Sequence, residues 1–230
     1  MRFDLIGGEV ANPPTQLAAT SLLRVTVRGK ESAVGRAFFD VVAEMGLSSY
    51  PGLYMFGSSP RTASSYGAYW PGLVPQSLVP QRIVWPDGST SDVDLPPTRS
   101  LAPSAQSRGE GTKGSWEGAT VRAPLGSIFQ ARSGDKGGNA NVGIWTGDRN
   151  AFEWLCEYLT EDAFRDLVPE ARGLSIDRCE LPNLLAVNFV VKGLLDGGAT
   201  ETLVVDNQAK ALGEYVLAKV VDMPSELLER

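Results

Sequence analysis

A segment with almost nothing to bury divides this chain into two parts. Residues 96–117 are rich in Pro, Ser, Gly and charged side chains and contain few apolar residues. This composition is typical of a linker, because it offers no apolar face on which a helix or a strand could pack. The 230 residues are therefore predicted to form a first part over 1–95 and a second part over 118–230.

Strand-like and helix-like segments alternate along the second part. The predicted strands are 125–131, 142–146, 175–181 and 202–206, and the predicted helices are 150–158 and 211–221. Thr160 is predicted to cap a further helical turn. The apolar stretch 184–195 favours a helix by its length, and its valines leave a strand open as the alternative. Such alternation is typical of a small α/β sandwich in which helices cover a sheet.

The first part contains the same two kinds of segment. Residues 22–27 form a β-branched run that predicts a strand, and apolar residues at helical spacing predict a helix over 33–45. Gly46 stands where the C-cap of that helix is expected. Another strand is predicted at 81–85, followed by the turn residues 86–88. Both parts are therefore expected to mix helices and strands.

The composition excludes several classes of chemistry. The chain contains no histidine, so it cannot by itself build a Ser-His-Asp or Cys-His site. Two cysteines without a metal-binding spacing predict neither a disulfide framework nor a zinc site, and we expect reduced, buried thiols and no metal. Any proton-transfer group must then be Asp, Glu, Lys, Tyr or Cys.

Charge and hydropathy narrow the partners and the compartment. The formal net charge is -6 and the basic residues are scattered, which argues against a nucleic-acid partner. The N-terminus carries charge too early for a signal peptide, and no apolar run has the length of a membrane span. We therefore expect a cytoplasmic protein without a membrane partner.

The best candidate for function is the polar, glycine-rich segment 132–141. Its hydrogen-bonding side chains are Arg132, Ser133, Asp135, Lys136, Asn139 and Asn141, and its glycines are Gly134, Gly137 and Gly138. Read as a loop, it could turn several backbone N–H groups toward a carboxylate or a phosphate, to which Arg132 and Lys136 would add positive charge. Asp135 beside Lys136 offers an acid/base pair. The alternative is a tight hairpin connection whose Asp and Asn side chains satisfy their own backbone.

Two asparagines form a second polar cluster within an apolar stretch. If 184–195 is helical, Asn183 could cap the helix, and Asn188 would be buried and need hydrogen-bond partners. The natural place to find those partners is the polar segment 132–141. The alternative is that Asn188 is satisfied locally.

Several of these motifs resemble the AtuA-like family, named for acyclic terpene utilisation. The segment from Ala131 to Gly143, then Leu-Pro-Asn at 181–183, Asn188-Phe189 and Gly197-Gly198, and finally Asp206 with Lys210 look like the C-terminal ferredoxin-fold domain of that family. Residues 3–7 and 78–81 resemble the end of its large N-terminal domain. The resemblance implies an α/β (α+β) chain in which a ferredoxin-like α/β sandwich follows a smaller α/β segment.

The resemblance also implies a function and a partner. It suggests a lyase or hydratase/dehydratase that acts on a branched organic acid or its coenzyme A thioester by proton transfer next to a carbonyl. We expect no cofactor other than coenzyme A as part of the substrate, and a separate larger subunit that carries the rest of the N-terminal domain. Gly138-Asn139 stands where family members often have a carboxylate and a threonine, so the resemblance leaves open whether this chain shares their substrate and reaction. The alternative is a non-catalytic binding or assembly subunit.

The candidate site residues combine the polar segment with the asparagine cluster. The expected catalytic residues are Asp135 and Lys136. The expected substrate-binding residues are Arg132, Ser133, Gly137, Asn139, Asn141, Asn183 and Asn188.

Overall fold

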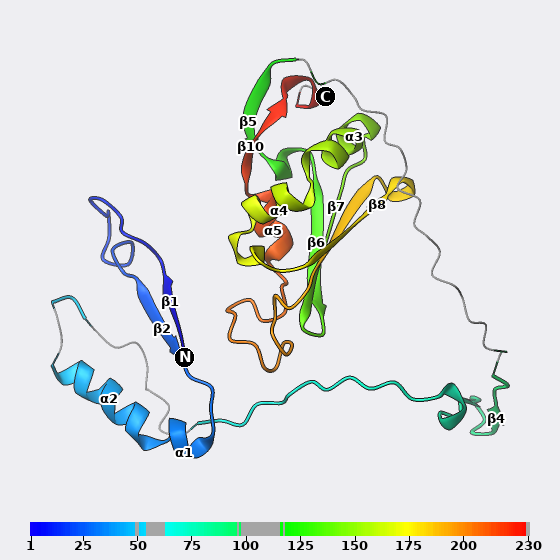
Figure 1. Cartoon of the computed structure of the whole chain (residues 1–230), viewed down its shortest axis with the longest axis horizontal. Helices are drawn as coiled ribbons and strands as arrows, with labels where there is room; N and C mark the ends of the chain where they lie inside the picture. The colour runs from blue at the N-terminus through cyan, green and yellow to red at the C-terminus, as the bar shows by residue number, and fades with distance from the viewer. Residues whose placement is uncertain (49–50, 54–62, 96, 98–115, 117, 229–230) are drawn as a thin grey trace. The chain divides into compact units, whose positions relative to one another are not determined.

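The computed structural model describes residues 1–48, 51–53, 63–95, 97, 116 and 118–228 (Figure 1). The predicted linker lies almost wholly outside these residues, so the boundaries at 95 and 118 stay predictions. By its internal contacts the chain forms two compact units, Met1–Gly67 with Leu203–Val205, and Ala68–Thr202 with Asp206–Arg230. Each unit is described by itself.

The first unit contains a β-hairpin and two helices. Strand β1 (Arg2–Ile6) pairs antiparallel with β2 (Leu22–Thr26), which confirms the predicted strand. The predicted helix is present but divided at Gly35 into α1 (Glu31–Val34) and α2 (Arg36–Leu47). The expected cap at Gly46 is wrong, because α2 continues to Leu47. The helix ends at Ser48, whose backbone N–H and hydroxyl both donate to the Glu44 carbonyl at 2.9 Å.

A small hairpin in the second unit matches the strand and turn predicted there. Strand β3 (Arg82–Val84) pairs with β4 (Thr90–Asp92). The turn between them has Gly88 at a φ of 82°, where a residue with a side chain would be strained, and the Gly88 N–H donates to the Trp85 carbonyl. A single 3-10 turn, Gln76–Leu78, precedes the hairpin.

The centre of the second unit is a four-stranded antiparallel sheet with helices against one face (Figure 1). The strands, in spatial order, are β6 (Gln130–Lys136), β7 (Asn139–Trp145), β9 (Ala186–Val191) and β8 (Ile176–Leu181). The helices are α3 (Arg149–Tyr158), α4 (Glu161–Leu167) and α5 (Leu212–Leu217). α5 contacts β6, α3 contacts β9 and α4 contacts β8. A separate two-stranded sheet pairs β5 (Thr120–Pro124) with β10 (Val220–Pro224).

Strand alternation buries one face of this sheet. Val142, Val187 and Phe189 are fully buried and face the helices, whereas the residues between them are only half-buried. Phe164 of α4 stacks on Phe189 with ring centroids 4.5 Å apart. The predicted cap of α4 is confirmed, since the Thr160 hydroxyl accepts from the Ala163 N–H. The sheet therefore has a core face covered by helices and a second, open face.

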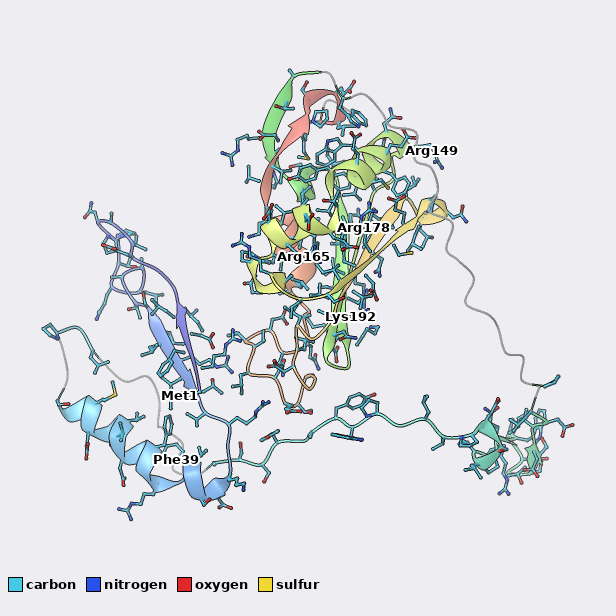
Figure 2. All side chains as sticks on the ribbon, in the orientation of Figure 1. Met1, Phe39, Arg149, Arg165, Arg178 and Lys192 are labelled. Carbon is cyan, nitrogen blue, oxygen red and sulfur yellow. The ribbon has the colours of Figure 1, made fainter. Side chains whose placement is uncertain are left out.

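Arg178, labelled in Figure 2, ties strand β8 to helix α3 on the core side. Its guanidinium donates to the backbone carbonyls of Cys156 and Leu159 and pairs with Glu180 at 2.7 Å. These bonds satisfy carbonyls at the end of α3 that have no partner inside the helix.

Four secondary-structure predictions in the C-terminal half of the chain are corrected. The preferred helix over 184–195 is wrong and its strand alternative is confirmed, because β9 pairs on both sides and needs only a period of two. Residues 202–206 form no strand. The helix predicted over 211–221 ends at Leu217, and the chain then enters β10. The strand predicted over 125–131 begins instead as a 3-10 turn, Leu125–Ser127, and β6 starts at Gln130.

Candidate functional site on the open face of the sheet

The polar segment predicted as a loop is almost entirely β-hairpin. Arg132 to Lys136 belong to β6 and Asn139 and Asn141 belong to β7, so Gly137 and Gly138 alone form the turn. Gly137 has a φ of 62°, which favours glycine at that position. Strand pairing forms here despite the polar residues because β7 is also paired with β9 along most of its length. The loop prediction is therefore wrong, and the hairpin given as its alternative is present, with β7 paired on both sides.

The hairpin distributes the candidate side chains over two faces. Arg132 of β6 lies opposite Gly143 of β7, and Lys136 lies opposite Asn139. Residues at these positions therefore share the open face. Ser133 and Asp135 alternate with them and point to the helix side. The Ser133 hydroxyl accepts from the Gly213 N–H of α5 at 2.8 Å, which gives this residue a structural contact.

Two asparagine side chains pair at the centre of the open face. The Asn141 amide donates to the Asn188 side-chain oxygen at 3.1 Å, and the Asn188 amide donates back to the Asn141 oxygen at 3.1 Å. This confirms the expectation that the partner of Asn188 lies in the polar segment. Each amide still has one N–H and further acceptor capacity that the pairing does not use. The pair is therefore able to hydrogen-bond a ligand lying on the sheet.

A pocket with a volume of about 360 Å³ adjoins the amide pair. Its lining residues are Gly143, Trp145, Leu181, Leu184, Ala186 and Asn188. Apart from the Asn188 amide the lining is apolar, and Gly143 leaves the space beside the Asn188 oxygen open. Trp145, Leu181 and Leu184 were not predicted as site residues. The sequence signal for Trp145 and Leu181 was their alternation with core residues, which can be recognised only when the strands are assigned, and Leu184 in its 3-10 turn gave no such signal.

Two lysine side chains approach Asp135 at the end of β6, one at its backbone carbonyl and one at its carboxylate. The Lys136 ammonium donates to the Asp135 backbone carbonyl at 3.0 Å, and the Lys210 ammonium is 3.7 Å from the Asp135 carboxylate. Lys210 comes from the segment before α5 and was not predicted as a site residue, although the family motif included it. The hairpin and this segment thus bring three charged groups together from distant parts of the sequence.

The remaining candidates are placed at the two ends of the sheet. The Asn139 side-chain oxygen accepts from the Gly193 N–H at 3.0 Å and so anchors the hairpin turn. Gly138 has no side chain, and its backbone carbonyl accepts a hydrogen bond from the Leu195 N–H. Asn183 is exposed in the 3-10 turn Pro182–Leu184, apart from the hairpin turn, and caps no helix.

Both cysteines are free thiols, but they are half-buried rather than buried as expected. Burial first, and the Glu180 carboxylate second, raise the pKa of the Cys156 thiol to about 12. A thiol with so high a pKa is a poor nucleophile at neutral pH. Across the described ranges, no three His, Cys, Asp or Glu side chains gather as metal ligands. In the same ranges, no helix combines the length and the apolar composition needed to cross a lipid bilayer.

Comparison with protein families agrees with the motifs. The model of the acyclic terpene utilisation family protein AtuA matches residues 1–85, and the model of the AtuA ferredoxin-like domain matches residues 123–222. The second match contains the four-stranded sheet and every candidate site residue. Searches among curated proteins and among solved structures found no match. Because the two matches together span most of its length, the chain belongs to the AtuA family, with a mixed α/β architecture and a ferredoxin-like domain that contains the candidate site residues.

Proposed function

We propose that this chain is the small subunit of a lyase or hydratase/dehydratase that acts on a branched organic acid or its coenzyme A thioester. The reaction would proceed by proton transfer next to a carbonyl. The observation that carries the proposal is the Asn141–Asn188 amide pair, which lies between an apolar pocket and cationic side chains on one face of the sheet. The name of the family, acyclic terpene utilisation, supports a branched apolar substrate.

The order of groups along β7 suits such a substrate. From Trp145 to Asn139 the open face runs from the apolar pocket through the amide pair to the neighbours of Lys136. Alternate residues of a strand are about 7 Å apart, so a short acyl chain in the pocket would place its carbonyl near the amides. Amide N–H groups fixed in this way stabilise the negative charge that develops on a carbonyl oxygen when a neighbouring proton is removed.

Asp135 is the proposed proton-transfer group, and Lys136 and Arg132 would hold the carboxylate or thioester oxygen. The Asp135 side chain is 33% exposed, so solvent and substrate have access to it. Although it alternates away from the open face, β6 is an edge strand, and a side chain near the end of an edge strand can be approached from either side. The 3.7 Å distance to Lys210 leaves the carboxylate free of a tight ion pair.

Matched variants test this proposal in an assay of hydration, dehydration or cleavage of branched acyl thioesters. Asp135→Asn and Lys136→Met should each lower kcat/KM by about two orders of magnitude or more, because proton transfer by a positioned group contributes typically 10²–10⁴-fold. Asp222→Asn at an exposed position and Lys219→Met at a half-buried one remove the same charges elsewhere in the domain and should leave the rate unchanged. Equal activity of Asp135→Asn and Asp222→Asn would remove Asp135 from the mechanism.

The β1–β2 hairpin favours the second candidate, a subunit whose main role is assembly. One face of the hairpin carries the cross-strand pairs Phe3–Val25 and Leu5–Leu23. The opposite face carries the Arg2–Asp4 ion pair at 2.8 Å. Phe3, Leu5 and Leu23 are 63%, 67% and 51% exposed.

A two-stranded hairpin is marginally stable unless its apolar face is covered. Where this unit's side chains are described, Val34 is the only buried hydrophobic residue. We propose that a larger subunit covers the apolar face. Native mass spectrometry of this chain co-expressed with candidate AtuA-family partners tests the idea: a stable hetero-complex supports it, and a chain that remains monomeric in their presence refutes it.

A further inference from the structure

We infer that Lys210 completes, with Arg132 and Lys136, a binding site for an oxyanion that carries two negative charges. The inference deepens the proposed function, on which it rests, because it names the charge of the group that a substrate presents at this end of the sheet. The site would consist of the three cationic side chains and the space beside Gly134, which has no side chain. The carboxylates of Asp135 and Asp206 lie next to it.

Gly134 creates the space that the Lys210 ammonium occupies. Residues 132, 134 and 136 share one face of β6, at spacings of about 7 Å. The middle position has no side chain, and a Cβ atom added to Gly134 would lie 3.3 Å from the Lys210 ammonium nitrogen. Lys210 therefore supplies a cation where the strand itself supplies none, between the positions of Arg132 and Lys136.

Asp206 holds the backbone of Lys210 in place. One carboxylate oxygen of Asp206 accepts from the Lys210 N–H at 2.8 Å, and the other accepts from the Ala211 N–H at 2.9 Å. Between Asp206 and Lys210 the chain turns through Ala209. This residue is buried and has a φ of 50°, a strained value for a residue with a side chain. A loop fixed in this way positions a lysine more firmly than an unrestrained surface loop would.

The charges around the site do not balance. Lys136 donates to a backbone carbonyl rather than to a carboxylate, and no described residue pairs with the Arg132 guanidinium. The nearest carboxylate, Asp135, is 3.7 Å from Lys210. Asp206 is the other carboxylate nearby, and both of its oxygens accept from backbone N–H groups, so Asp135 is the one carboxylate among the described residues that contacts a cationic side chain of the site. Two unmatched positive charges fit a phosphate group or a pair of carboxylates better than a single carboxylate.

An NMR titration of the full chain tests this inference without requiring turnover. Inorganic phosphate, malonate and acetate are added at constant ionic strength, while the amide signals of Gly134, Gly137 and Lys210 are followed. Phosphate or malonate should bind at least several-fold more tightly than acetate, and whichever of the two binds more tightly identifies the source of the dianion. Equal binding of acetate, or no response at these amides, would overturn the inference.

Variants separate this inference from the proposed catalysis. Lys210→Met should weaken dianion binding about tenfold, and Lys219→Met, which removes a charge over the Tyr215 ring, should not. Asp135→Asn should bind the dianion more tightly, because a competing carboxylate is gone, even though it should lower the proposed turnover by about two orders of magnitude or more. Weaker or unchanged dianion binding in Asp135→Asn would count against the charge argument, whatever happens to activity.

A third variant perturbs the site without removing a charge. Gly134→Ala places a methyl group against the flexible end of Lys210, so the fold should persist while the ammonium moves by a few tenths of an ångström. Dianion binding should weaken about threefold, with an unchanged circular dichroism spectrum. Wild-type affinity in both Gly134→Ala and Lys210→Met would show that Lys210 is not part of the site.

Discussion

Replacing Asn188 with alanine tests whether the amide pair is an energetic unit. The substitution removes two hydrogen bonds of 3.1 Å and leaves the half-buried Asn141 amide without its partner. A neutral hydrogen bond contributes about 1 kcal/mol net, and an orphaned buried amide costs a further ~1 kcal/mol or more. We therefore expect the free energy of unfolding to fall by about 2–3 kcal/mol, with a similar loss for Asn141→Ala.

The double variant makes this expectation sharper. Both single variants lose the same two hydrogen bonds, and removing the second partner relieves the orphaned amide, so Asn141→Ala/Asn188→Ala should lose less than the sum of the two single variants, by about 2–3 kcal/mol. Urea unfolding followed by near-ultraviolet circular dichroism is the assay, since the signal reports the stacked Trp154 and Tyr158 rings of this domain. Asn207→Ala, which removes one exposed bond to the Ala199 carbonyl, is the control and should cost under about 1 kcal/mol. Additive losses within about 0.5 kcal/mol would refute the pairing as an energetic unit.

Three further predictions concern other parts of the chain. Gly138→Ala should lower the free energy of unfolding by about 1–3 kcal/mol or more, because the added Cβ would overlap the Asp196 carbonyl. Thermal melts measure this loss, and the control Gly147→Ala, which has open space around it, should be neutral. The Cys156 thiol, with a pKa raised to about 12, should stay protonated and resist iodoacetamide at pH 8, gaining reactivity only as the pH approaches that value; rapid labelling at pH 8 would contradict the burial argument. Leu23→Lys should leave the stability of the isolated chain within about 0.5 kcal/mol while abolishing capture of the larger subunit in a pull-down, and retained capture would move the interface elsewhere.

The sequence predicted the fold class and the family but misread the segment that carries the site. Glycines and polar side chains in 132–141 are typical of a loop, but β6 pairs with β7 across the two-residue turn Gly137–Gly138, and β9, some fifty residues later in the chain, pairs with the other side of β7. The same long-range pairing decided 184–195, where length favoured a helix and the alternation of Val187, Phe189 and Val191 with less buried residues shows the period of a strand. The strands that pair with 184–195 lie elsewhere in the sequence, so its local pattern could not decide between helix and strand, whereas 132–141 contains both sides of its own hairpin and was misread locally.

The candidate site was predicted as a set of residues rather than as an arrangement. The pairing of Asn188 with the polar segment was foreseen, because a polar side chain in an apolar stretch needs a partner. The separation of Ser133 and Asp135 from Arg132 and Lys136 followed only from the strand assignment. Lys210 was missed because its neighbour Asp135 is seventy-five positions away, and no spacing in the sequence records that contact.

The central claim is that the open face of the four-stranded sheet binds the acyl substrate, and a single NMR titration tests it most directly. A short branched acyl thioester such as isovaleryl-coenzyme A is added to the full chain while the side-chain amide signals of Asn141 and Asn188 and the indole N–H signal of Trp145 are followed. The account predicts that these three signals shift together and saturate at the same ligand concentration. If they stay unmoved at saturating thioester, or if the shifts fall only on residues of the core face, the open face is not the substrate site.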